Sequence, residues 1–395
     1  NLKFFFFFWT NGKGSVCEML NRILIDSGYI VGKFLSPQLI RFNDTITVND
    51  IEIEDEEISE ILEKLSVYID EYNLNNDIPV KWFEVITSVA LIYYAQKKCD
   101  FVVLETGLGG TWDCTNVVDS MISIIVSVGM DHVDILGKDI SEIAEQKAGI
   151  IKKNSDVIYL RRPDDETVEK VIKAKCEKEN SILHQINPQD CTDYRYDKNM
   201  QYFTYKNIKD IPVNLKGKKQ IYNSTICIET VEILRKKGYK IDENIMKTAL
   251  SKVIHRARFE TLEENPEIIY DGAHNPPAIE NLIKTINQYY KEKQKIFIVS
   301  ILGTKDYKEI VHNLVEEYSE DIFYFTDGID EKPFIKKEDL EKVAVETNEK
   351  GKYIIDSLEN AIKEVTMKYK NSEKVIFIIG SFYIYKKVLE VLSKD

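Results

Sequence analysis

The sequence predicts an α/β protein with two domains, a doubly wound and mostly parallel sheet domain followed by a smaller Rossmann-like domain. The first reason is length, because 395 residues exceed what one ordinary hydrophobic core holds. The second is that apolar runs of strand length alternate with amphipathic helical stretches along most of the chain. The third is that several of these runs end in glycine, as buried parallel strands do when they lead into a loop.

The first predicted domain covers residues 1–262 and holds the larger sheet. Its clearest strands are Cys99–Gly107 and Met121–Gly129, and its clearest helices are Ser15–Tyr29 and Trp82–Lys98. This order predicts a doubly wound sheet, whose ligands bind at the carboxyl ends of the strands. Residues 51–65 predict a helix with a solvated acidic face. The polar residues 161–216, with pieces such as QYFTYK, predict an antiparallel or irregular edge of this domain.

The second predicted domain covers residues 263–395. Four strand-like runs, each followed by a loop and a helix, predict a separate Rossmann-like sheet; they are Glu267–Asn275, Lys295–Gly303, Asp321–Asp327 and Lys374–Phe382.

With 44% hydrophobic and 30% charged residues, composition favours a globular, soluble protein over a disordered one. The formal net charge of −13 argues against a nucleic-acid partner and against an anionic membrane surface. The six cysteines are scattered without a CxxC pair, so we expect a reducing cytoplasm and neither a disulfide framework nor a zinc site. No apolar run approaches the roughly 18 residues that a membrane helix needs. Because the chain begins with Asn1 rather than Met, we expect that a preceding segment is missing.

The segment TNGKGS (Thr10–Ser15) has the composition of a phosphate-binding loop at the start of a helix. Its two glycines permit a close approach of the backbone to an anion, Lys13 supplies a positive charge and Ser15 offers a hydroxyl to Mg²⁺. The strict pattern G-x4-G-K-[ST] fails at its first position, where Phe7 stands, and at its last. A chance turn is therefore the alternative for this segment taken alone.

Two more strand ends carry polar groups suited to a bound phosphate. Glu105 ends an apolar strand before a glycine-rich turn with Asp113, and a carboxylate there is costly unless it meets a cation. Beside the phosphate loop, Glu105 would hold Mg²⁺; the alternative is a capped turn with a solvent-facing carboxylate. His132 follows the next strand, and Lys147 lies in a helix beside two small residues. Without further evidence, these two are equally well a structural histidine and a surface lysine.

These motifs occur with several others, in order and at the spacing of one known family. They are TNGKGS (Thr10–Ser15), SPQLIRFNDTI (Ser36–Ile46), ETGLGGTWDCTN (Glu105–Asn116), GMDH (Gly129–His132), QKAGI (Gln146–Ile150), HRARFE (His255–Glu260), DGAHNP (Asp271–Pro276) and GSFYI (Gly380–Ile384), with Gln220 three residues before Asn223. In this set the chain resembles the folylpolyglutamate synthase/dihydrofolate synthase family of the Mur ligase superfamily. HRARFE keeps Arg258 of the family's WPGRFE but not its Trp-Pro-Gly, and GSFYI matches the family's GSLYL.

The resemblance implies an ATP-dependent ligase that adds L-glutamate to a carboxylate of folate, or to that of dihydropteroate, through an acyl phosphate. It implies that ATP is bound by Thr10, Asn11, Gly12, Lys13, Gly14, Ser15, Asn223, Arg258, Asp271 and Asn275. It implies that the substrates are bound by Ser36, Pro37, Arg41, Phe42, Asp113, His274 and Ser381. Two Mg²⁺ ions would be held by Ser15, Glu105 and His132. Catalytic roles would belong to Lys13, Glu105, His132, a carbamylated Lys147, Arg258 and His274.

The resemblance also implies a cytoplasmic monomer of one-carbon metabolism. Such a protein has no nucleic-acid or membrane partner, and its domains close over the substrates.

The run FFFFFW (Phe4–Trp9) departs from the family pattern. The family's strand reads like IHVAG before the loop, so Trp9 stands at the glycine that lets the backbone turn toward phosphate. Consecutive phenylalanines would also overpack a central strand. We expect weakened ATP binding from these residues; an altered stretch of sequence is the other interpretation. Two alternatives for function therefore stay open, another Mur-type amide ligase and a homologue that binds ligands without catalysis.

Overall fold

The computed structural model describes the chain except residues 1–2, 9–11, 127, 130–132, 162–164 and 395, and except the side chains of residues 6–8, 13 and 133–134. It divides into two compact units, unit 1 with residues 1–214 and 220–253 and unit 2 with residues 215–219 and 254–395. Unit 2 starts at Ile254, earlier than the predicted boundary at Glu263. The reason is that the segment before this boundary bonds to unit 2, because Gly272 N–H donates to Ala257 O (2.9 Å).

Unit 1 contains an eight-stranded sheet in the order β4-β3-β2-β5-β1-β6-β7-β8. The strands are β1 (Lys3–Phe8), β2 (Val31–Phe34), β3 (Ile46–Val48), β4 (Ile51–Glu52), β5 (Phe101–Glu105), β6 (Ser120–Ile125), β7 (Asp156–Leu160) and β8 (Ile182–Ile186). All neighbours pair in parallel except β3, which pairs antiparallel with β2 and β4. The predicted mostly parallel sheet is confirmed, and β1 with its phenylalanines is a central strand between β5 and β6.

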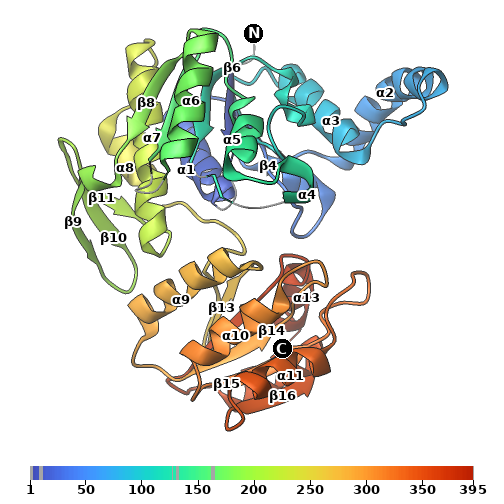
Figure 1. The fold of residues 1–395 in the computed structure, drawn as a ribbon, viewed down its shortest axis with the longest axis vertical. Coiled ribbons are helices and arrows are strands. Elements are labelled where there is room, and N and C mark those ends of the chain that lie inside the picture. The colour runs from blue at the N-terminus through green and yellow to red at the C-terminus, as the bar shows by residue number, and fades with distance from the viewer. Residues whose placement is uncertain (1–2, 9–11, 127, 130–132, 162–164, 395) are drawn as a thin grey trace. The chain divides into compact units, whose positions relative to one another are not determined.

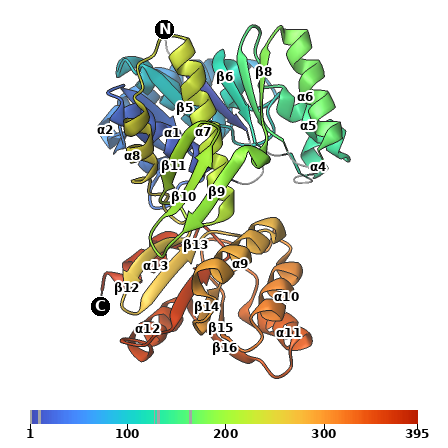
Figure 2. The same cartoon turned by 90° about the vertical axis from the view of Figure 1, so that its left-hand side faces the viewer.

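Helices cover both faces of this sheet, as Figures 1 and 2 show. One apolar cluster joins one face to α3 (Trp82–Gln96), α5 (Ile140–Ala148) and α6 (Glu166–Glu179). On the other face, α1 (Lys13–Asp26) packs against α8 (Glu243–Leu250) and α7 (Lys218–Lys236). The remaining helices of this unit are α2 (Asp55–Asn75) and α4 (Val133–Leu136). The doubly wound arrangement brings the start of α1 to the carboxyl edge of the sheet.

The first two phenylalanines of β1 fill opposite faces of the sheet. Phe4 is 9% exposed and belongs to the cluster with α3, α5 and α6. Phe5 is 0% exposed, and its ring lies 5.3 Å from that of Phe101. Both rings are accommodated, because successive strand residues alternate between faces. The other side chains of the aromatic run lie outside the described residues.

The prediction of an antiparallel or irregular edge for residues 161–216 is confirmed only for the second half of this segment. Helix α6 and strand β8 continue the parallel order of the large sheet, and β9 (Cys191–Tyr196), β10 (Gln201–Tyr205) and β11 (Ile208–Val213) form a separate antiparallel sheet. The segment QYFTYK is the middle strand of that small sheet. The helix escaped prediction because only Val168, Ile172 and Cys176 of its residues are buried.

Unit 2 contains a six-stranded sheet in the order β12-β13-β17-β14-β15-β16. Its strands are β12 (Glu260–Glu264), β13 (Glu267–Asp271), β14 (Lys295–Val299), β15 (Ile322–Thr326), β16 (Lys352–Asp356) and β17 (Val375–Ile379). Its helices are α9 (Pro276–Tyr290), α10 (Tyr307–Glu317), α11 (Lys337–Thr347), α12 (Leu358–Lys368) and α13 (Tyr385–Leu392). All pairs are parallel except β12 with β13. The four predicted strands of a Rossmann-like sheet are confirmed as β13, β14, β15 and β17.

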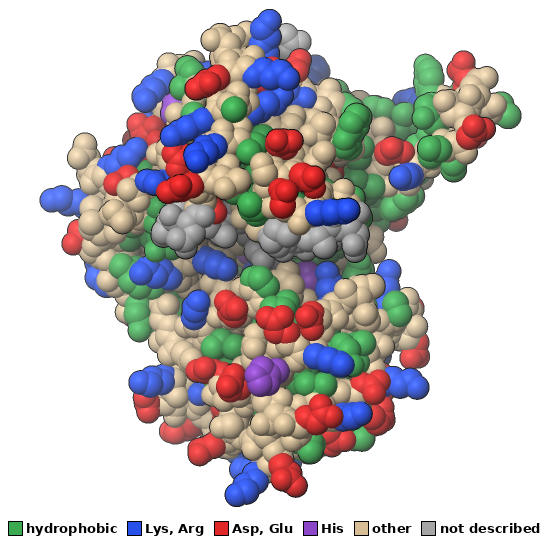
Figure 3. All heavy atoms as spheres, in the orientation of Figure 1, with side chains coloured by type: hydrophobic (Ala, Val, Ile, Leu, Met, Phe, Trp, Pro, Cys, Tyr) green, Lys and Arg blue, Asp and Glu red, His purple; other side chains and the backbone are tan. Residues whose placement is uncertain are grey.

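The surface mixes acidic and basic side chains on the face that Figure 3 shows. Exposed apolar residues gather on the second half of α2 and just after it, at Val67, Tyr68, Tyr72, Leu74 and Ile78. Within the described parts of the chain, no helix is both long and apolar enough to cross a membrane.

A buried lysine ties α1 to the antiparallel end of the large sheet. The Lys33 side chain on β2 is 9% exposed, and its Nζ lies 2.7 Å from Glu18 Oε2 on α1. The same Nζ lies 3.0 Å from Asp50 Oδ1, in the turn between β3 and β4. Burial alone would lower the pKa of Lys33, but the two carboxylates outweigh it and the pKa is raised. The ammonium therefore stays charged and fixes the helix that follows the phosphate loop.

We expect Lys33→Met to lower the free energy of unfolding by about 3 kcal/mol, because it leaves the partly buried Glu18 carboxylate without its cation and removes one of the two cations near Asp50. Urea unfolding followed by circular dichroism measures this loss. Lys173→Met is the matched control in the same unit, because Lys173 is 51% exposed in its pair with Glu169. Its expected effect is below about 0.5 kcal/mol. Equal effects of the two substitutions would contradict the role of Lys33.

Candidate active site

Helix α1 begins at a glycine whose backbone few other residues adopt. Gly12 is the N-cap with φ 106° and ψ 2°, in the left-handed region that favours glycine. An α-helix leaves the N–H groups of its first turn without partners inside the helix, and its dipole is positive at this end. Gly14 is half-buried and Ser15 is 2% exposed in this turn. The start of α1 therefore offers backbone donors and one buried hydroxyl to an anion.

Helix α7 links the predicted residue Asn223 to Ser15 through Gln220. Gln220 Nε2 donates to Ser15 Oγ (3.2 Å), and Asn223 Nδ2 donates to Gln220 Oε1 (2.8 Å). Asn223 is 4% exposed. Gln220 was part of the Q-x-x-N motif but was not predicted to take part in the site. Its signal was the spacing of three, which puts two side chains on one face of a helix.

Glu105 ends β5 as a buried carboxylate. It is 4% exposed, and Ser36 N–H donates to its Oε2 (2.9 Å). Burial raises the pKa of the Cys17 thiol on α1, and the Glu105 carboxylate raises it further. Glu105 pairs in register with Phe7 of β1, five residues before the N-cap Gly12, and α1 packs against β5, so this strand end lies near α1. The alternative of a solvent-facing glutamate is wrong. Ser15 and Glu105 supply the hard oxygen ligands that suit Mg²⁺.

Several predicted residues lie outside the described residues. They are Thr10, Asn11 and His132, together with the side chain of Lys13.

Lys147 lies at the end of α5 and is 1% exposed, so the alternative of a surface lysine is wrong. Gly149, the small residue after Ala148, allows Thr111 to pack closely against the end of α5. A Cβ at Gly149 would lie 2.0 Å from Thr111 Oγ1. Thr111 N–H and Oγ1–H both donate to Gln146 O (2.9 and 3.0 Å). The glycine-rich turn after Glu105 is thus clamped onto the helix that carries Lys147.

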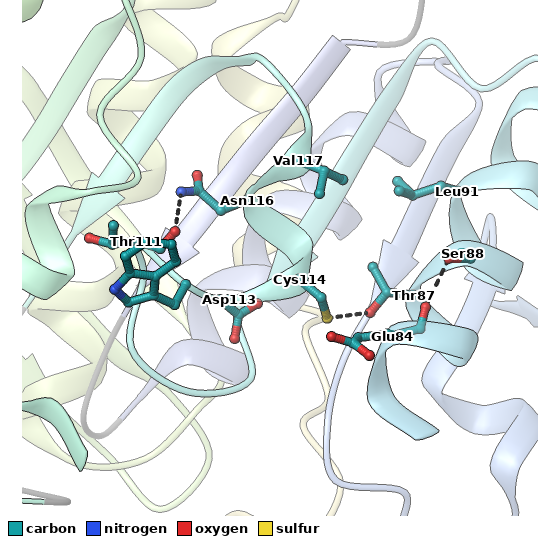
Figure 4. Close-up of a pocket in the computed structure, with 10 residues that line it drawn as sticks. Glu84, Thr87, Ser88, Leu91, Thr111, Asp113, Cys114, Asn116 and Val117 are labelled. Atoms are coloured by element: carbon teal, nitrogen blue, oxygen red, sulfur yellow. Dashed lines mark hydrogen bonds between the residues drawn. The ribbon is translucent and has the colours of Figure 1, made fainter. Parts of the chain in front are cut away.

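A pocket of about 400 Å³ lies between this turn and α3. Asp113 and Cys114 line it from the turn, and Glu84 and Thr87 line it from α3, as Figure 4 shows. Cys114 Sγ and Thr87 Oγ1 are hydrogen-bonded at 3.2 Å. The Asp113 carboxylate accepts from Leu108 N–H (2.7 Å), Thr115 N–H (3.0 Å) and the Thr115 hydroxyl. Asp113 therefore holds the turn in shape at the wall of the pocket.

The segment from Ser36 to Phe42 is organised by Asp44. Its Oδ2 accepts from the N–H groups of Leu39 (3.0 Å), Ile40 (2.7 Å) and Arg41 (3.2 Å). Arg41 Nε donates to Glu52 Oε2 (2.8 Å). The ring of Phe42 lies 5.5 Å from that of Trp82, which is 63% exposed. Of the residues predicted here, Pro37 and Arg41 are exposed, and Ser36 is the one that bonds to Glu105.

In unit 2, three predicted side chains meet at the end of β13. Asp271 accepts from Phe259 N–H (2.9 Å) and Ala273 N–H (2.8 Å). Burial raises its pKa, and the nearby positive charge of Arg258 partly opposes this. His274 Nδ1 is 2.8 Å from Gly272 O. The Arg258 Cζ atom lies 4.4 Å from the ring centre of Phe382, and the His274 ring lies 5.4 Å from it. Phe382 was not among the predicted site residues.

Asn275 and Ser381 hydrogen-bond to backbone N–H groups near Asp271 and His274. Asn275 Oδ1 accepts from Ala278 N–H (3.0 Å) and caps α9. Ser381 is 1% exposed, and its Oγ accepts from Tyr383 N–H (3.1 Å).

Comparison with known proteins agrees with both units. Residues 10–231 match the Mur ligase middle domain, and residues 257–382 match the Mur ligase glutamate ligase domain.

Relatives resemble the chain over nearly its whole length. It is 30% identical over 393 residues to the dihydrofolate synthase/folylpolyglutamate synthase of Bacillus subtilis, covering 97% of this chain and 89% of that one. The structure of folylpolyglutamate synthase from Thermotoga maritima is 27% identical, with a TM-score of 0.83 over 99% of this chain and 89% of that one. The structure of Escherichia coli FolC in complex with DHPP and ADP is 25% identical, with the same TM-score and the same coverage of both chains. The chain therefore belongs to the Mur ligases and, among them, to the dihydrofolate synthase/folylpolyglutamate synthase family.

Proposed function

We propose that the chain ligates L-glutamate to a carboxylate of folate and converts ATP to ADP and phosphate, with dihydropteroate as a second acceptor. One observation carries the proposal: Glu105, the buried end of β5, pairs in register with the end of β1, the strand that leads to the glycine-initiated start of α1 and its buried Ser15. This is a site for an anion and its metal ion at the carboxyl edge of a doubly wound sheet. The E. coli relative in complex with DHPP and ADP supports the same pair of ligand classes.

The chemistry must hold two anions together and stabilise charge that moves between them. The acceptor carboxylate attacks the γ-phosphorus of ATP and gives an acyl phosphate. The amine of L-glutamate then displaces phosphate through a tetrahedral intermediate. In the proposal, Lys13 and the N–H groups of Gly12 and Gly14 hold the phosphates, and Arg258 offsets the charge of the transferred group.

The proposal includes Mg²⁺. Ser15 and Glu105 would hold one ion, and Glu105 with His132 a second. When bound, Mg²⁺ would neutralise phosphate charge.

Other residues have proposed binding roles. Ser36, Pro37, Arg41, Phe42 and Asp113 would face folate, His274 and Ser381 glutamate, Asn223 adenine, and Asp271 with Asn275 the nucleotide. We also propose a cytoplasmic monomer, for which light scattering would give about the chain mass of 45.9 kDa.

The direct test is ADP release by the purified chain with ATP, Mg²⁺, tetrahydrofolate and L-glutamate. We expect release that requires the folate, the amino acid and the metal together, and that stops with excess EDTA. Dihydropteroate in place of tetrahydrofolate tests the second acceptor. A cell-wall nucleotide peptide as the preferred acceptor would favour another Mur-type ligase. ATP binding without ligation of glutamate to any acceptor would contradict the catalytic proposal.

A second prediction concerns Trp9, which stands where the family pattern has glycine. We expect Trp9→Gly to bind ATP about tenfold more tightly, because glycine at this position of the family pattern lets the backbone turn toward phosphate. Calorimetric titration with a non-hydrolysed ATP analogue measures the change. Leu74→Gly, at a residue that is 86% exposed on α2, should leave the affinity unchanged. An unchanged affinity of Trp9→Gly for the analogue would contradict the interpretation that the aromatic run weakens ATP binding.

A third prediction concerns Lys147, which we propose is carbamylated. Lys147 matches the family lysine that is carbamylated, and it is 1% exposed at the end of α5. We expect a ¹³C carbamate resonance in protein supplied with labelled bicarbonate. The resonance should be absent in Lys147→Ala and present in Lys153→Ala, whose lysine is exposed. A spectrum without a carbamate signal in the wild-type chain would rule the modification out.

A further inference from the structure

The ring of Phe382 joins two residues that the proposed function uses. It follows β17, and its centre lies 4.4 Å from Arg258 Cζ, the distance of a cation–π contact. On the same ring, His274 makes an edge contact with its centroid at 5.4 Å and a 71° angle between the planes. Aromatic pairs favour this geometry. One side chain therefore contacts both a cation assigned to the phosphates and a histidine assigned to glutamate.

The backbone around Phe382 packs closely against its ring. A Cβ at Gly272 would lie 2.2 Å from Cε1 of Phe382, so this close approach requires glycine. Gly272 N–H donates to Ala257 O (2.9 Å), which joins the loop after β13 to the segment that carries Arg258. Gly272 O is 2.8 Å from His274 Nδ1. Three chain segments thus pack around one ring.

The hydrogen bond of His274 also shows which ring nitrogen carries the proton. A backbone carbonyl accepts but cannot donate, so Nδ1 carries the proton in its bond to Gly272 O. In a neutral ring, Nε2 is then the nitrogen that can accept a hydrogen bond. The ring of Phe382 limits rotation of the imidazole about the position that this bond sets.

We propose that Phe382 is a positioning residue, which holds Arg258 and His274 in one working orientation. The proposal rests on the proposed ligase function for its kinetic consequence, but its geometric part does not. Leucine, which the family's GSLYL pattern has here, fills space without offering a π face to a guanidinium. The chain therefore depends on an aromatic ring where its family's pattern does not.

The test compares Phe382→Leu with Phe382→Tyr, which keeps the ring, and with Tyr383→Leu, which removes the neighbouring ring. Tyr383 is 37% exposed and contacts Lys332 instead. We expect Phe382→Leu to lower kcat/KM for glutamate about 5- to 30-fold, with the KM for folate unchanged. Phe382→Tyr and Tyr383→Leu should stay near the wild-type values.

A spectroscopic measurement separates positioning from catalysis. The chain has five histidines, so the ring resonances of His274 can be assigned with His274→Gln. We expect them to move in Phe382→Leu, because the ring current is lost, and to stay nearly in place in the other two variants. A nuclear Overhauser effect between the two rings of the wild-type chain tests the contact even where Phe382→Leu does not fold.

The outcomes are distinct. Wild-type kinetics and unmoved His274 resonances in Phe382→Leu, or a missing Overhauser effect, would overturn the positioning role. A chain without ligase activity but with moved resonances would overturn the proposed function and keep the geometry. An equal kinetic loss in Tyr383→Leu would show a general loosening of the loop, and would also overturn the proposal.

Discussion

The buried carboxylate of Glu105 is the constraint on which unit 1 depends. A carboxylate that is 4% exposed is costly unless donors or cations meet it. Ser36 N–H meets it from the end of β2, and α1 lies close by. The glycine-rich turn that follows Glu105 is clamped to α5 through Thr111. One acidic strand end thus gathers the phosphate-loop helix, the predicted folate loop and the helix with Lys147.

In both units, a glycine allows two chain segments to approach each other closely. Gly149 lets Thr111 reach the end of α5, and Gly272 lets Phe382 cover the loop after β13. In each case a Cβ would meet a neighbour at under 3 Å, which packed interiors do not accept. The small residues of the QKAGI and DGAHNP motifs are therefore packing requirements next to the functional side chains. A motif of this kind specifies contact between segments as well as chemistry.

The sequence predicted the parts of the fold that depend on local pattern. Strands β5, β6, β13, β14, β15 and β17 are continuous apolar runs, and Glu105 could be singled out from its position at the end of β5, whereas Asp271 came from the family resemblance. Helix α6 and strands β7 and β8 were missed, because α6 buries few side chains and its period is weak. Gln220 and Phe382 were missed as site residues for another reason. Gln220 acts on Ser15, 205 positions away, and no local period encodes such a contact.

The aromatic run raises two separate questions, how its rings pack in the sheet and what replaces the glycine before the loop. In β1, Phe4 and Phe5 occupy opposite faces and are accommodated, so aromatic side chains at the start of the run are compatible with a central parallel strand. The second problem lies at the other end of the run, where the family pattern has glycine and this chain has Trp9. Gly12 still takes the left-handed backbone from which α1 starts, and Ser15 is still buried against α7. We therefore expect the departure from the family to affect the approach of phosphate to the loop, whereas the sheet and the helix on either side of the loop have the fold of its relatives.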